Sequence, residues 1–79
     1  MINRLKQAFA AALRVPLSTD FESLQAHAVP EWDSVGHMEL ISEIEATFGV
    51  TLSTDDVFDL DSFSKARQIL IRHGVDIST

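Results

Sequence analysis

The sequence predicts an all-α fold, a four-helix bundle with three longer helices, one short helix and a long loop between helices one and two. Apolar residues recur at spacings of three and four, which places them on one face of a helix. Residues that favour helix starts and stops, such as serine, aspartate and glycine, separate these stretches. The chain has 79 residues, so we expect residues 1–79 to form a single domain with one modest core.

The first helix is expected at about residues 2–14, followed by a long connection over residues 15–33. Val15 should end the helix because a residue that precedes a proline is disfavoured in the helical conformation. A loop of this length in a small domain is usually functional or held by its own apolar side chains. A short turn of helix is expected at residues 19–24. The side chains that could hold the loop are Leu17, Phe21, Leu24, Val29 and Trp32.

The second helix is expected at residues 34–48, with Gly49 as its stop. Either Asp33 or Ser34 can cap it, because a side-chain oxygen there accepts from the free amides of the first turn. Gly36 lowers helix stability less in the first turn than it would further along, and its bare backbone would let a partner approach closely. The apolar stripe of this helix consists of Leu40, Ile41, Ile44 and Phe48, and Glu39, Glu43 and Glu45 lie off it.

Two further helices follow. Ser53 or Thr54 should cap a short helix at about residues 54–60, and Asp61 with Ser62 should cap the last helix at about residues 63–73. Gly74 should end the last helix, and residues 75–79 are expected to be a flexible tail. The side chains expected to face the core from the last helix are Phe63, Ala66, Ile69 and Leu70.

Acidic residues are concentrated in the middle of the chain. The net charge is −6, and residues 34–61 contain seven acids and no base. Nucleic acid would be repelled by such a surface, whereas basic protein surfaces would be attracted to it. A solvated acidic face without a partner is the alternative interpretation.

Several classes of site and location are disfavoured. The chain has no cysteine, and His27, His37 and His73 show no ligand spacing, so no metal site is expected. No apolar run approaches the ~18 residues of a membrane span, and no signal peptide is apparent. We therefore expect a soluble, cytoplasmic monomer. Ser34 and His37 lie one helical turn apart, but a hydrolase also needs an oxyanion hole and a cleft, so no catalysis is expected and His37 should be exposed.

Ser34 is the main candidate for a functional residue. The start of a helix has free N–H groups and the positive end of the helix dipole, which favour an attached phosphate. The motifs Trp32-Asp33-Ser34-Val35, Met38-Glu39-Leu40-Ile41, Ile44-Glu45 and Phe48-Gly49-Val50 resemble the acyl carrier protein family over about residues 2–73. This resemblance implies an acyl-carrier-type bundle with 4′-phosphopantetheine on Ser34, and with Asp33 supporting the modification.

The resemblance also implies a carrier that does no catalysis. A phosphopantetheinyl transferase would modify it with coenzyme A and magnesium, and enzymes with basic surfaces would load and use its acyl or aminoacyl thioester. Their expected docking residues are Val35, Met38, Glu39, Glu43 and Glu45, although Val35 and Met38 could instead be peripheral core. Val35-Gly36-His37 departs from the usual family pattern. Fatty-acid, polyketide and related pathways remain open, as does the alternative of an unmodified acidic helical interaction module.

Overall fold

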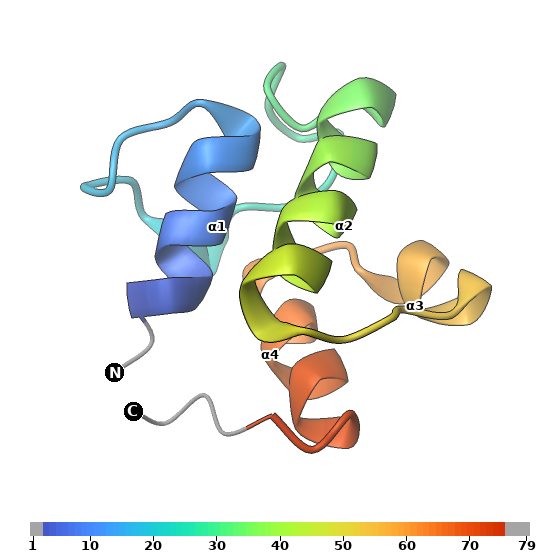
Figure 1. The fold of residues 1–79 in the computed structure, drawn as a ribbon. Coiled ribbons are helices and arrows are strands. Elements are labelled where there is room, and N and C mark those ends of the chain that lie inside the picture. Colours follow the sequence, from blue (N-terminus) through green and yellow to red (C-terminus); the bar gives the residue numbers. More distant parts are fainter. Residues whose placement is uncertain (1–2, 76–79) are drawn as a thin grey trace.

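The computed structural model describes residues 3–75, and these residues form a bundle of α-helices without a strand (Figure 1). This confirms the predicted all-α four-helix bundle. In Figure 1, α1 and α2 lie side by side and α3 projects at the edge of the molecule. The elements are α1 (Asn3–Leu13), the 3₁₀ helix η1 (Phe21–Ser23), α2 (Ser34–Phe48), α3 (Thr54–Asp59) and α4 (Phe63–Arg72).

The helix ends follow the capping residues of the sequence. Asp33 caps α2, and its side chain accepts a hydrogen bond of 2.8 Å from the Gly36 amide. Ser53 caps α3 in a capping box with Asp56, which is the reciprocal pairing of side chains and amides at a helix start. Ser62 caps α4. Gly49 and Gly74 take the left-handed conformation that favours glycine after a helix, with φ of 67° and 81°.

Four aromatic side chains form the centre of the core. The ring of Phe9 lies edge-on to the rings of Trp32 and Phe63, with centroids 5.5 and 5.0 Å away, and Phe21 completes the cluster. Each of these rings is almost completely buried. The cluster therefore joins α1, the long loop and α4. The other buried apolar residues are Leu5, Ala8, Ala12, Leu13, Leu24, Leu40, Ile41, Ile44, Leu52, Leu60, Ala66, Ile69 and Leu70.

The long loop is attached to the bundle at several points. Phe21, within η1, and Leu24 are buried, as predicted, but Leu17 is 59% exposed and does not hold the loop. Further along, the Ala26 amide donates to the Asp61 carbonyl at 2.8 Å. This bond ties the loop to the connection between α3 and α4, which brings the residues before Ser34 close to α3.

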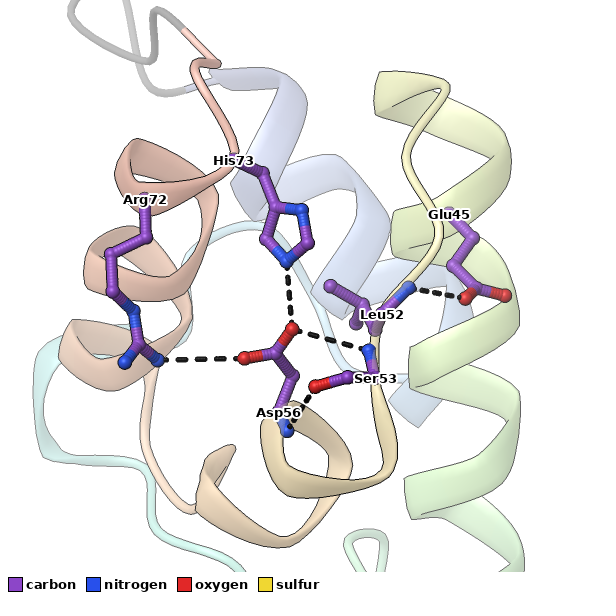
Figure 2. Close-up of polar contacts among 6 residues, drawn as sticks. All are labelled: Glu45, Leu52, Ser53, Asp56, Arg72 and His73. Atoms are coloured by element: carbon purple, nitrogen blue, oxygen red, sulfur yellow. Dashed lines mark hydrogen bonds and ion pairs between the residues drawn. The ribbon is translucent and has the colours of Figure 1, made fainter.

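None of the six residues of α3 is buried, and polar contacts hold the helix at its start (Figure 2). Asp56 Oδ2 lies 2.7 Å from His73 Nε2 and accepts from the Ser53 amide at 3.2 Å. The hydrogen bond to His73 is the main reason why the pKa of Asp56 is lowered. Just before α3, the Leu52 amide donates to Glu45 Oε2 at 2.8 Å. Because α3 buries no apolar residue of its own, these polar contacts with α2 and with the end of α4 hold it in place.

The C-terminal segment corrects one prediction. Val75 was expected in a flexible tail, but its amide donates to the Leu70 carbonyl at 3.0 Å and its side chain packs against the core. Residues 76–79 of the predicted tail, and Ile2 of the predicted first helix, lie outside the described residues. No helix within residues 3–75 is both long and apolar enough to cross a lipid bilayer.

Candidate functional site

Ser34 is the first residue of α2, and it is exposed. The cap of this helix is provided by Asp33, whose side chain accepts from the Gly36 amide and whose carbonyl accepts from the His37 amide at 2.8 Å. The Ser34 hydroxyl is therefore not the capping group. It lies at the positive end of the helix dipole, where a negatively charged substituent is stabilised.

Gly36 is buried because the long loop lies against the first turn of α2. A Cβ atom at this position would come within 2.2 Å of the Glu31 carbonyl oxygen and 3.3 Å of Asp33 Oδ1. The expectation that a partner approaches the bare backbone here was therefore wrong. The protein's own loop occupies that space, and the contact holds the residues before Ser34 close to the helix.

His37 is half-buried and hydrogen-bonded rather than exposed, which corrects another prediction. Trp32 Nε1 donates to His37 Nδ1 at 2.9 Å, and His37 Nε2 lies 2.8 Å from the carbonyl oxygen of Val57 in α3. The rings of Trp32 and His37 are stacked, with centroids 6.2 Å apart. Both ring nitrogens of His37 are thus engaged elsewhere, so this histidine is not placed to act as a base for Ser34. Trp32 itself is fully buried and covers the core.

A groove of about 430 Å³ opens beside Ser34. It lies between the start of α2, the side of α3 and the loop that precedes Trp32. Phe58 is 80% exposed at this groove and Met38 is 56% exposed. Sequence reasoning did not place His27 and Phe58 near Ser34, because residues from three separate segments meet there only in the folded chain. The lining residues are Ala26, His27, Ser34, His37, Met38, Val57, Phe58, Leu60 and Asp61.

The predicted docking residues of α2 have different surroundings. Val35 is 66% exposed and Met38 is also exposed, so neither is peripheral core. The side chain of Glu39 is 44% exposed and lies 4.0 Å from Arg14 Nη2, an ion pair at the limit of contact distance. Glu43 is half-buried, and Glu45 has one oxygen engaged with the Leu52 amide. Glu45 therefore has a role in the fold that the sequence did not indicate.

Residues 31–67 match the family model of the phosphopantetheine attachment site. This segment, a little under half of the chain, is similar to phosphopantetheine attachment domains. The match confirms the resemblance to the acyl carrier protein family. No curated protein and no solved structure matched the chain.

Proteins with a phosphopantetheine attachment domain carry 4′-phosphopantetheine covalently on a serine. They act as carriers and not as catalysts. The attachment domain spans α2, α3 and the first half of α4, so it contains the groove and the exposed serine at the start of α2. An exposed hydroxyl beside a helix N-terminus fits a phosphate ester, since the hydroxyl is accessible and the helix dipole favours the phosphate charge.

Proposed function

We propose that the protein is a carrier that holds an acyl or aminoacyl group as a thioester on a 4′-phosphopantetheine arm attached to Ser34. The observation that supports this proposal best is the position of Ser34, which is exposed, begins a helix and lies within the attachment domain. Such a carrier binds and presents its cargo, and partner enzymes perform the chemistry.

The other serines of the attachment domain are less suitable. The Oγ atoms of Ser53 and Ser62 cap α3 and α4, where they accept from backbone amides at 3.1 and 3.0 Å. Ser64 is half-buried within α4. Ser42 is exposed, but it lies in the middle of α2, where the backbone N–H groups are already paired. Ser34 therefore combines accessibility with the electrostatic environment that a phosphate needs.

Modification of Ser34 would be a phosphoryl transfer. The Ser34 oxygen attacks the phosphorus next to the pantetheine of coenzyme A, its proton is removed by the transferase, and adenosine 3′,5′-bisphosphate leaves. The free N–H groups at the start of α2 stabilise the charge of the resulting phosphodiester. We further propose that Asp33, next to Ser34, supports this step with the magnesium ion that the transferase uses. The arm supplies a terminal thiol for the thioester.

The surface around Ser34 is suited to transient partners. Val35 and Met38 offer exposed apolar contact, and Glu39, Glu43 and Glu45 on the same helix provide negative charge. Charge at the rim of an interface raises the association rate, while apolar contact at its centre supplies affinity. We therefore propose docking of basic enzyme surfaces along α2. The glycine pair that is frequent before the serine of peptidyl carriers is absent, which favours an acyl cargo. Fatty-acid, polyketide or related biosynthesis is therefore the proposed setting, with a cytoplasmic location as part of the same proposal.

Intact-mass measurement after co-expression with a broad-specificity phosphopantetheinyl transferase tests this proposal. The wild-type protein should gain one phosphopantetheine, and Ser34→Ala should gain none. Ser42→Ala is the matched control, since it removes an exposed serine from the same helix and should still be modified. An unmodified wild-type protein, under conditions that modify a known carrier, would instead favour an acidic helical interaction module.

A further inference from the structure

A chain of hydrogen bonds connects the core to α3 through His37. The indole Nε1–H of Trp32 can only donate, so His37 Nδ1, 2.9 Å away, must be the acceptor and must carry no proton. The ring proton then lies on Nε2, which donates to the Val57 carbonyl at 2.8 Å. The buried tryptophan therefore determines the tautomer of His37 and directs its remaining N–H toward α3.

This contact is important for α3 because the helix has little apolar anchorage of its own. None of its residues is buried, and the buried residues Leu52 and Leu60 lie just outside its two ends. Asp56 ties the start of α3 to the end of α4 through His73 (Figure 2). The bond from His37 to Val57 joins α3 directly to the first turn of α2, next to Ser34.

The same bond joins two residues that line the groove beside Ser34. Val57 and Phe58 contribute the α3 wall of this groove, and Ser34, His37 and Met38 contribute the α2 wall. We propose that His37 is a positioning residue that holds α3 in place as this wall and thereby controls access to the groove. The inference rests on the proposed function, because the groove acquires its role from cargo attached through Ser34.

Two substitutions separate hydrogen bonding from packing. His37→Phe keeps a ring that can stack on Trp32 but removes both hydrogen bonds. His37→Gln offers an acceptor and a donor side by side and should restore both bonds. The matched control is His27→Asn, because His27 also lines the groove but is exposed and has a φ of 64°, a conformation in which asparagine is well tolerated.

Amide hydrogen exchange of the unmodified protein tests the contact without any assumption about Ser34. His37→Phe should speed the exchange of the Val57 and Leu60 amides roughly tenfold relative to the core amides of α1, the upper range for loss of one hydrogen bond. His37→Gln should stay within roughly threefold of the wild type, and His27→Asn should not change. Equal acceleration in all helices, or an equal effect of phenylalanine and glutamine, would overturn the proposal.

The tautomer gives an independent result. Nitrogen chemical shifts of the neutral His37 ring should report a proton on Nε2, and a proton on Nδ1 would contradict the proposed chain of bonds.

A further experiment tests access to the groove. The transferase loads an octanoyl group from octanoyl-coenzyme A, and hydroxylamine cleaves the thioester. Cleavage should be several-fold faster in His37→Phe than in the wild type or His37→Gln. If hydrogen exchange shows that α3 is loosened in His37→Phe but the modified variant and the modified wild type are cleaved at equal rates, control of access is refuted. If the transferase modifies neither protein, only the proposed function is refuted.

Discussion

Replacement of Gly36 by alanine adds one methyl group at the tightest backbone contact of the candidate site. The new Cβ would lie 2.2 Å from the Glu31 carbonyl oxygen, whereas carbon–oxygen contacts are normally at least ~3.3 Å long. The loop must therefore move by about 1 Å. It cannot do so freely, because Trp32, the residue after Glu31, is fully buried, and its amide donates to the Val29 carbonyl at 3.1 Å.

The change in the free energy of unfolding follows from two destabilising effects and one stabilising effect. Overpacking at a rigid site costs ~1–3 kcal/mol, and displacement of the Asp33 cap, 3.3 Å from the new Cβ, costs ~1 kcal/mol more. Alanine regains at most ~1 kcal/mol of helix propensity over glycine, because this position lies in the first turn. We expect the free energy of unfolding to fall by about 2 kcal/mol, which lowers the melting temperature of a domain of this size by about 8–16 °C.

Urea titration and thermal melting followed by circular dichroism measure this effect. Ser42→Ala is the control, because Ser42 is exposed in the middle of the same helix and alanine there should leave stability unchanged or raise it by up to ~0.5 kcal/mol. If Gly36→Ala is as stable as the wild type, the close contact with Glu31 is not a constraint and the reasoning is refuted.

Three further predictions concern charge. Glu39→Lys and Glu43→Lys should slow association with a basic partner enzyme several-fold at low salt, with little loss of stability. Gln68→Lys, at an exposed position of α4, should leave the association rate unchanged. Equal association rates for all three variants in stopped-flow measurements would exclude docking along α2. Because the pKa of Asp56 is lowered from its usual value of 3.8, the ionised carboxylate stabilises the folded protein when the pH is above 3.8. This stabilisation is lost as the pH falls through the lowered pKa. Asp56→Asn should therefore weaken the dependence of the free energy of unfolding on acid pH, measured by urea titration. An unchanged pH dependence in this variant would contradict that. Added salt or magnesium should raise the melting temperature by screening the seven acids of residues 34–61, and a lower or constant value would count against repulsion among them.

Helix positions could be predicted because their signals are local. The cap Asp33, the stop Gly49 and the apolar stripe between them define α2 within its own stretch of sequence, and the structure has this helix at the expected residues. The first helix ends at Leu13 because Arg14 takes a left-handed φ of 59°, close to where Val15 and Pro16 indicated. The exposed position of Ser34 at a helix start could be predicted for the same reason.

The surroundings of Ser34 could not be predicted in this way, because they depend on residues far apart in sequence. His37 was expected at the surface, but its partner Val57 lies twenty residues away and reaches it only when α3 packs beside α2. Gly36 offered no signal that its space is taken by the Glu31 carbonyl. Glu45 resembled any other acid of α2 until the fold placed the Leu52 amide beside it.

The attachment of the long loop has a consequence for protein engineering. Leu17 and Ser18 are exposed. The segments on either side of them are anchored in the core, α1 through Phe9 and the rest of the loop through Phe21. A peptide bond cut between them would leave both pieces with their interior contacts intact. We expect that the chain could be divided there into a short α1 peptide and a larger fragment bearing Ser34, and that the two would associate through the core contacts of Phe9.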